Sequence, residues 1–391
     1  MSKIEWFDRA PDRRGSGSYK WDSTADNDVI PVWVADMDFE TAPVIKEALR
    51  KRVEHGVFGY TLVGDDYYNA LISWFNTRHC YDINRENIIY TSGVVPAISA
   101  IIKAMTRPGD GVIVQTPVYN CFFSSIRNNG CTIVEAPLHR IEAEEGFFTY
   151  EMDYEALERA ASGENVRLML LCNPHNPAGR CWRREELEKV AEISRRHDVL
   201  VVSDEIHCEL TMPGLEYVPY GTVDADGVIC LSPSKAFNTA GLQIANIVCP
   251  DSETRALVDK AININEVCDV NPFGPVALQA AYSESGLEWL NALRSYLFDN
   301  YKLLANEFHK HLPECPVSRL EATYLPWIDI TALGINSSEI EEEMLKEAKV
   351  WVNSGDMYGK DGYIRINIAC PRKRLEEALR RIIDWLKAHI R

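Results

Sequence analysis

The chain has 391 residues, 46% of them hydrophobic, and its 58 aspartate and glutamate residues outnumber 41 lysine and arginine residues, which gives a net charge of −17. A soluble chain of this length exceeds the roughly 250 to 300 residues at which one hydrophobic core stops growing, so we expect two domains. The acidic balance disfavours nucleic acid and an anionic membrane surface as partners, because both attract clustered positive charge.

Strands and helices are expected to alternate from about residue 41 to the 280s. The expected strands are residues 87–90, 111–115, 132–136, 167–172, 199–203, 228–231 and 244–249. Their short, nearly continuous apolar runs are typical of strands buried on both faces. Helical spacing of apolar residues between them, as in 184–197, predicts an α/β domain with a mainly parallel, doubly wound sheet.

The pattern changes in the last hundred residues. We expect a long helix at 286–312, a strand at 323–330, an acidic amphipathic helix at 338–349, a strand at 363–368 and a final helix at 373–389. This succession predicts a second, smaller α+β domain, to which the strand-like residues 29–35 could return. We therefore expect a large domain at 47–285 and a small domain built from 1–46 and 286–391.

The remaining composition indicates a reduced environment. The first residues are charged and lack the apolar core of a secretion signal, and no stretch holds about 18 consecutive apolar residues, so we expect a cytoplasmic protein. The 11 cysteines are scattered, odd in number and without a Cys-x-x-Cys pair. Neither a disulfide framework nor a metal site is expected.

Three polar motifs follow three of the expected strands. They are Asn-Pro-His-Asn-Pro-Ala-Gly at 173–179, Asp-Glu-Ile-His at 204–207 and Ser-Pro-Ser-Lys at 232–235. Because ligands of doubly wound sheets collect beyond the carboxyl ends of the strands, Asn176, Asp204 and Lys235 should converge. Singly, they could be an ordinary turn, a helix cap and a surface amine; their shared position at strand ends favours a site.

The three side chains meet the needs of one kind of cofactor. Neutral neighbours around Lys235 favour a partly desolvated amine with a lowered pKa, which can form a Schiff base with an aldehyde. A pyridine nitrogen in such a cofactor needs a carboxylate to stay protonated, and Asp204 fits that task. Residues 91–97, with Gly93, open a helix whose N-terminus favours a phosphate, and Ser232 and Ser234 could add hydroxyl donors.

These motifs resemble those of a known superfamily. Further matching segments are Val34-Ala-Asp-Met-Asp-Phe39, Phe58-Gly-Tyr-Thr61, Thr116-Pro-Val-Tyr119, Ala322-Thr-Tyr-Leu325 and Arg365-Ile-Asn-Ile-Ala-Cys-Pro-Arg372. Over essentially its whole length the chain resembles the fold-type I, aspartate-aminotransferase-like enzymes that use pyridoxal 5'-phosphate. It is most similar to their cystathionine β-lyases, or carbon–sulfur lyases, of the MalY/PatB type.

The resemblance implies roles for particular residues. Lys235 would carry the cofactor and act in catalysis with Tyr119, which would also stack on the cofactor ring. The other implied cofactor contacts are Asp204 to the pyridine nitrogen, Asn176 and His207 to the ring oxygen, Gly93, Val94, Val95, Ser232 and Ser234 to the phosphate, and Tyr60 from the neighbouring subunit of a homodimer. Arg365 would bind the substrate carboxylate, with Ala35, Asn176, Tyr324 and Asn353 in the pocket wall.

Each of these additions also has a simpler interpretation. Tyr60 and Tyr119 could be interface or core aromatics, Arg365 half of a structural ion pair, and His207 a core histidine. Two positions depart from the aminotransferase pattern. Gln243 stands where those enzymes usually place a phosphate-binding arginine, and His207 where they place a tyrosine. Both departures fit the lyase subgroup better.

The motif set favours α,β-elimination on cystathionine or related cysteine S-conjugates. Lys235 would remove the Cα proton, a thiolate would leave from Cβ, and the remainder would hydrolyse to pyruvate and ammonia. Two alternatives stay open: an aminotransferase that uses a 2-oxo acid as its second substrate, and a cofactor-bearing protein that acts by binding a regulatory partner.

Overall fold

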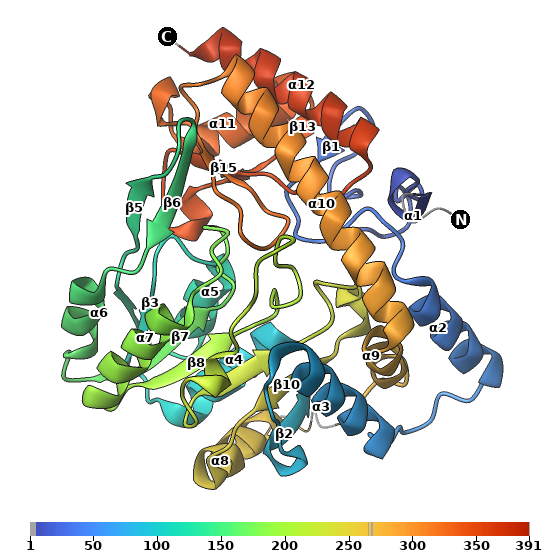
Figure 1. Ribbon diagram of the computed structural model, residues 1–391, viewed down its shortest axis with the longest axis vertical. Helices are drawn as coiled ribbons and strands as arrows, with labels where there is room; N and C mark the ends of the chain where they lie inside the picture. The colour runs from blue at the N-terminus through green and yellow to red at the C-terminus, as the bar shows by residue number, and fades with distance from the viewer. Residues whose placement is uncertain (1–4, 265, 267–268, 391) are drawn as a thin grey trace.

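A seven-stranded sheet forms the core of the lower half of the molecule in Figure 1. The computed structural model describes residues 5–264, 266 and 269–390. The strand order is β2 (Ile88–Thr91), β10 (Ala245–Val248), β9 (Val228–Leu231), β8 (Leu200–Asp204), β7 (Val166–Cys172), β3 (Gly111–Val114) and β4 (Thr132–Glu135). Strand β10 runs antiparallel to both of its neighbours, and the other pairs are parallel. The predicted mainly parallel sheet is confirmed.

The sheet is buried on both faces because its strands are apolar at successive positions. Val112 and Val114 of β3 pack into one hydrophobic cluster, whereas Ile113 between them packs into another. Since successive side chains of a strand point to opposite faces, a continuous apolar run supplies both clusters.

Helices cover the two faces of this sheet. One face packs against α4 (Val94–Met105), α5 (Asn120–Asn128) and α8 (Ser252–Asn263). The other packs against α3 (Asp65–His79), α6 (Tyr154–Ala161), α7 (Arg184–Arg196) and α9 (Gly274–Ala281), and α2 (Pro43–His55) packs against α9. Helices on both faces of a mainly parallel sheet define the doubly wound α/β class, as the sequence predicts.

A second sheet of six strands lies in the upper half. Its order is β14 (Asn353–Ser354), β15 (Tyr363–Arg365), β12 (Trp327–Asp329), β11 (Val317–Ser318), β6 (Phe147–Glu151) and β5 (His139–Glu142). The hairpin β5–β6 comes from the middle of the segment 47–285, and the expected strands do not include it. Its first strand is charged and partly exposed, so it lacks the apolar run by which the other strands are recognised.

Several predicted elements of this half are shorter than expected. The strand expected at 323–330 is limited to β12, because Thr323 has a left-handed φ of 75° and Pro326 lacks the N–H that a strand pairs with. The strand at 363–368 is confined to β15. The helix at 338–349 is divided into α11 (Ser337–Glu343) and a π-helical turn, Met344–Ala348. The final helix, α12 (Arg372–His389), is confirmed.

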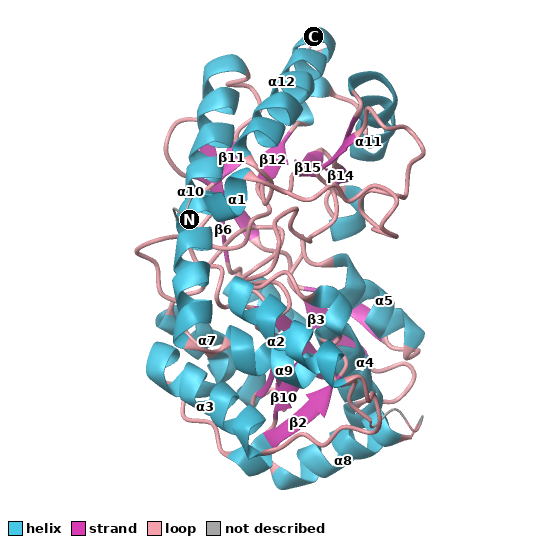
Figure 2. Cartoon of the chain, turned by 90° about the vertical axis from the view of Figure 1, so that its right-hand side faces the viewer, coloured by secondary structure: helices cyan, strands magenta, loops and turns pink. Residues whose placement is uncertain are grey.

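One long helix joins the two halves. Figure 2 shows α10 (Glu284–His311) running alongside both of them. Ser283 is the N-cap of this helix, and its Oγ accepts a hydrogen bond from the Gly286 N–H (3.2 Å). Leu290, Leu293 and Leu297 are buried along one stripe with the three- and four-residue spacing of a helix face. The division into domains at 47–285 and at the two chain ends remains a proposal.

The N-terminal segment is tied to the C-terminal half through β1 (Ile30–Pro31), which pairs in parallel with β13 (Val350–Trp351). Close by, the buried carboxylate of Asp38 accepts hydrogen bonds from Trp21 Nε1 (2.9 Å), Lys20 Nζ (3.1 Å) and Arg374 Nη1 (2.8 Å). Burial acts to raise the pKa of Asp38, but the charges of Lys20 and Arg374 outweigh it and lower this pKa.

We expect Asp38→Ala to destabilise the protein by about 3–5 kcal/mol, because Lys20 would stay buried without its full partner. Chemical denaturation of the variant, followed by tryptophan fluorescence, measures this loss. The matched control is Glu40→Ala, which breaks an exposed ion pair with Lys46 and should barely change stability. A loss no larger than that of the control would contradict the role given to Asp38.

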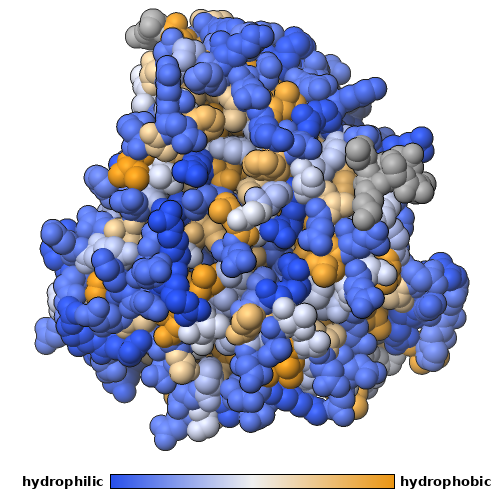
Figure 3. Space-filling view, viewed as in Figure 1, coloured by the Kyte–Doolittle hydropathy of each residue, from blue (hydrophilic) through white to orange (hydrophobic). Residues whose placement is uncertain are grey.

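Figure 3 shows a mostly hydrophilic face with scattered hydrophobic residues. Among the described residues, no helix is long and apolar enough to cross a membrane.

Candidate active site

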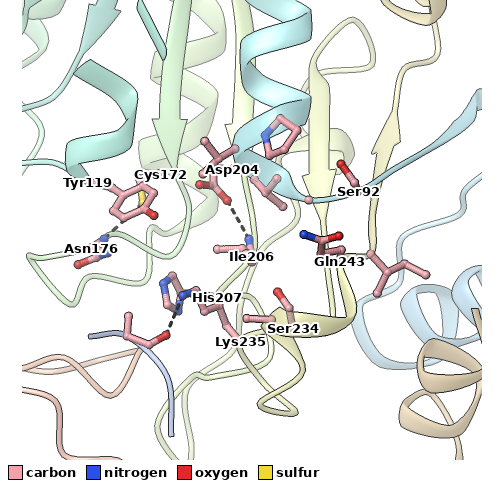
Figure 4. A pocket seen from close by; sticks show the side chains of 17 residues that line it. Ser92, Tyr119, Cys172, Asn176, Asp204, Ile206, His207, Ser234, Lys235 and Gln243 are labelled. Carbon is pink, nitrogen blue, oxygen red and sulfur yellow. Dashed lines mark hydrogen bonds between the residues drawn. The ribbon is translucent and has the colours of Figure 1, made fainter. Parts of the chain in front are cut away.

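A cavity of about 190 Å³ lies where β7, β8 and β9 end and α4 begins. Figure 4 shows side chains from these elements pointing into it. Ten predicted site residues line it: Ala35, Gly93, Val94, Val95, Tyr119, Asn176, Asp204, His207, Ser234 and Lys235. The three motifs that follow strands therefore meet at one edge of the sheet, as their positions predict.

Asp204 is the last residue of β8 and is buried at the base of the cavity. Its Oδ1 accepts a hydrogen bond from the Ile206 N–H (3.1 Å), which fixes the carboxylate against the turn that follows the strand. Burial raises the pKa of Asp204 to about 6. A cationic group placed beside this carboxylate would reverse that shift, so the site favours a ligand with a protonated nitrogen here.

Lys235 follows β9 and lies between Asp204 and the N-terminal segment. Its Nζ donates a hydrogen bond to the Ala35 carbonyl (2.7 Å), which is drawn as a dashed line in Figure 4. Burial, and secondly the charge of Arg365, lower the pKa of Lys235 to about 8. The uncharged amine, which can act as a nucleophile or base, is therefore far more abundant near neutral pH than for an ordinary lysine.

We expect the cofactor-free protein to react with pyridoxal phosphate at a rate that rises with pH and levels off above about pH 8. The reason is that only the uncharged Lys235 amine attacks an aldehyde, and lysine loses its proton as the pH rises through its pKa of about 8. Stopped-flow absorbance across a pH series measures this profile. Arg365→Gln removes a positive charge and should move the profile to higher pH. A midpoint near the ordinary lysine pKa in the unchanged protein would contradict the lowered pKa of Lys235.

The N-terminus of α4 lines the opposite end of the cavity. No side chain caps this helix, so its first-turn N–H groups, including those of Val94 and Val95, are available to an anion. Ser234 adds a hydroxyl to the same wall. Ser232 does not line the cavity; its Oγ donates to the Ile244 carbonyl (2.6 Å) and accepts the Ser234 N–H (3.1 Å), so it supports Ser234 from behind.

Tyr119 and Asn176 form the side of the cavity. Tyr119 stands immediately before α5, and burial raises the pKa of its hydroxyl well above the ordinary value. The Asn176 N–H donates to Cys172 Sγ (3.4 Å), also drawn in Figure 4, which fixes the backbone beside the cavity. The Asn176 Oδ1 accepts from Arg365 Nη1 (3.2 Å).

Arg365, at the end of β15, lies behind Asn176 and does not line the cavity itself. Its Nη2 donates to the Trp33 carbonyl (3.0 Å), and its buried Nε has no hydrogen-bond partner among the described residues. Asn353 Nδ2 donates to the same Trp33 carbonyl (2.9 Å), and its buried Oδ1 is also unpartnered. The Trp33 carbonyl therefore holds Arg365 and Asn353 side by side next to the cavity wall.

The remaining predicted residues occupy different positions. His207 lines the cavity with an unpartnered Nδ1, and burial lowers its pKa well below the ordinary value, so the ring is neutral. Tyr324 lies behind the wall and donates its hydroxyl proton to the Ala35 carbonyl (3.0 Å). Tyr60 is 96% exposed and lies away from the cavity of its own chain.

Several lining residues were not predicted as contacts. They are Ser92, Pro96, Cys172, Ile206, Ala240 and Ile244. Ser92 and Pro96 belong to the quoted segment 91–97, Cys172 directly precedes the motif at 173–179, and Ile206 lies within the motif at 204–207, so the sequence indicated their positions. Gln243, noted as a departure from the aminotransferase pattern, also lines the cavity.

The fold and the site together define the class. Residues 27–382 match the aminotransferase class I and II family, and the chain belongs to this family. Cystathionine beta-lyase PatB of Bacillus subtilis is 39% identical over 386 residues, covering 96% of this chain and 98% of the relative. Cystalysin of Treponema denticola, whose crystal structure contains pyridoxal 5'-phosphate, has a TM-score of 0.92 and 34% identity, covering 98% of both chains. The pyridoxal-phosphate-bound C-S lyase of Staphylococcus hominis has a TM-score of 0.90 and 32% identity, covering 98% of this chain and 100% of that chain.

The residues of the cavity fit pyridoxal phosphate. The uncapped helix end beside Ser234 suits the phosphate, and the buried Asp204 suits a protonated pyridine nitrogen. The Lys235 amine lies at the same cavity and suits the aldehyde. Within residues 5–264, 266 and 269–390, no group of three or more His, Cys, Asp or Glu side chains could hold a metal ion.

Proposed function

We propose that this protein is a pyridoxal-phosphate-dependent carbon–sulfur lyase that acts on cystathionine or related cysteine S-conjugates. The observation that carries the proposal is one cavity that holds a lysine with a lowered pKa, a buried carboxylate and an uncapped helix N-terminus. The PatB, cystalysin and C-S lyase relatives support the choice of this reaction within the family.

The protein's own residues would bind the substrate and move its protons. Bound pyridoxal phosphate supplies an aldehyde for the substrate amine and a ring that stabilises negative charge at Cα. Arg365 would bind the α-carboxylate through its guanidinium, which Asn176 and the Trp33 carbonyl hold in place. Lys235, which is mostly uncharged above about pH 8, would then take the Cα proton as general base.

Other residues would define the surroundings of the reaction. Tyr119 would cover the cofactor ring, while Asp204 would keep the pyridine nitrogen protonated. A thiolate would leave from Cβ, and the three-carbon remainder would hydrolyse to pyruvate and ammonia. The neutral His207 would contact the ring oxygen through a nitrogen that has no partner in the structure.

The test is to give the purified holoenzyme cystathionine without a 2-oxo acid. We expect stoichiometric pyruvate, measured with lactate dehydrogenase, and free thiol, measured with a thiol reagent. Aminotransferase activity, the second candidate, is favoured by the family match alone and would instead require an added 2-oxo acid. Failure of both reactions with the cofactor visibly bound would favour the regulatory binding protein.

We also propose that two chains form a homodimer with shared active sites. The segment around Tyr60 carries several exposed apolar side chains, Val57, Phe58, Tyr60 and Leu62, and exposed apolar groups in one short segment are typical of an interface. Tyr60 would then reach the phosphate of the neighbouring subunit. Mixing Tyr60→Ala subunits with Lys235→Ala subunits should restore part of the activity, whereas no restoration would contradict shared sites. A cytoplasmic location stays a prediction.

A further inference from the structure

Tyr358 contacts two residues predicted for the substrate side of the site, Arg365 and Asn353. It ends the short helix η6 (Asp356–Tyr358) between β14 and β15 and is buried. Its ring faces Arg365, whose guanidinium carbon lies 4.7 Å from the ring centroid. Its hydroxyl accepts a hydrogen bond from Asn353 Nδ2 (3.0 Å).

The ring of Tyr358 completes the support of the Arg365 guanidinium. The two Nη groups are directed to Asn176 and to the Trp33 carbonyl, which fixes the edge of the guanidinium. The face is fixed by the Tyr358 ring, because an aromatic face attracts a cation, most strongly where water is excluded. Among the described residues, Asn176 and the Trp33 carbonyl use one N–H of each Nη group, so the second N–H of each Nη is left for a ligand.

The backbone of Tyr358 links this support to the opposite side of the site. Its carbonyl accepts a hydrogen bond from the Val118 N–H (3.0 Å), one residue before Tyr119. Arg365 is on the six-stranded sheet, whereas Tyr119 follows a strand of the seven-stranded sheet. Tyr358 therefore spans the junction between the two sheets at the point where the substrate carboxylate would bind.

We propose that Tyr358 is a positioning residue that holds Arg365 in the orientation that binds the substrate carboxylate, an inference that rests on the proposed function. It follows that Tyr358 governs the affinity for carboxylate-bearing amines and not the chemistry at Cα. Carboxylate affinity would be lost when the ring is removed and kept when only the hydroxyl is removed.

The experiment compares two amines that differ only in the carboxylate. L-alanine and ethylamine are titrated into the holoenzyme, and binding is followed by the visible absorbance of the cofactor. For Tyr358→Leu we expect alanine to bind about 10-fold more weakly, a factor between those of an exposed and a fully desolvated cation–aromatic contact, while ethylamine changes less than about twofold. The KM for cystathionine should rise by a similar factor, and kcat should stay within about threefold.

Two variants separate positioning from packing. Tyr358→Phe keeps the ring and should bind alanine within about threefold of the wild type. Tyr363→Leu is the matched control, because Tyr363 is a buried tyrosine of β15 whose ring packs against Trp327 and Phe148 instead. We expect the control to leave the ratio of alanine to ethylamine affinity unchanged.

A double-mutant cycle completes the test. In an Arg365→Ala background, Tyr358→Leu should weaken alanine binding no further, because its effect runs through the arginine. Three results would each overturn the proposal. In Tyr358→Leu, these are an equal loss of affinity for alanine and ethylamine, or alanine affinity unchanged from the wild type. The third is an equal loss of alanine affinity in Tyr363→Leu. Tyr358→Met takes the place of Tyr358→Leu if the latter does not fold. Binding is measured without turnover, so this test does not depend on the release of thiol. If the proposed lyase reaction fails, Tyr358→Leu can still show a loss of affinity for alanine alone.

Discussion

Lys235→Ala is expected to reduce the release of thiol and pyruvate from cystathionine by at least about 10²–10⁴-fold, the usual contribution of a general base. The expected loss is large because Lys235 has two tasks, holding the cofactor and removing the Cα proton. The amine suits both, since burial and the charge of Arg365 lower its pKa to about 8. Initial rates with cystathionine, together with the mass of the borohydride-treated protein, measure the two losses.

Two further variants identify the reason for the loss. Lys235→Arg keeps a positive charge, but arginine stays protonated and so cannot accept the Cα proton. This variant should be as inactive as Lys235→Ala. Lys103→Ala removes an exposed lysine from α4, the helix whose N-terminus lines the cavity, and should retain activity. Cofactor still linked covalently to the Lys235→Ala chain would show that another amine holds it.

Asp204→Asn is expected to lower kcat by about 10²–10³-fold, the range found when one preorganised electrostatic partner is removed from an active site. Asparagine has the shape of aspartate, so the hydrogen bond from the Ile206 N–H to Oδ1 can persist and the fold should be retained. The charge is what is lost. The neutral amide cannot hold a proton on the pyridine nitrogen, and the ring then stabilises a carbanion poorly.

Steady-state kinetics and the pH dependence of the cofactor absorbance test this expectation together. Asp204→Glu keeps the charge on a longer side chain and should lose less activity than Asp204→Asn. A variant Asp204→Asn with nearly normal kcat would mean that another group protonates the nitrogen. Equal losses in both variants would point to shape rather than charge.

Much of the cofactor site is predictable from the sequence because it depends on local patterns. The strands β7, β8 and β9 are apolar runs, and each is followed by its polar motif within a few residues. Parallel strands end at a common edge, so Asn176, Asp204 and Lys235 meet as soon as the sheet forms. The uncapped start of α4 is also a local feature.

The contacts between distant segments were decided only by tertiary structure. The carbonyl of Ala35 accepts from both Lys235 and Tyr324, and these three residues lie far apart in the chain. The hairpin β5–β6 joins the second sheet although it lies within the segment of the first, because β6 pairs with β5 on one side and with β11, from the C-terminal half, on the other.

The length and composition by themselves indicated a two-part acidic protein, and the motifs indicated the chemistry of one cavity. Which side chains face that cavity and which stand behind it was decided by packing: Ser232 supports Ser234, and Arg365 is held by Asn176, Trp33 and Tyr358. Hydrophobic spacing and turn residues specify single helices, strands and turns, each from its own short stretch of sequence. Contacts across hundreds of residues depend instead on how the two sheets pack, which no local pattern records.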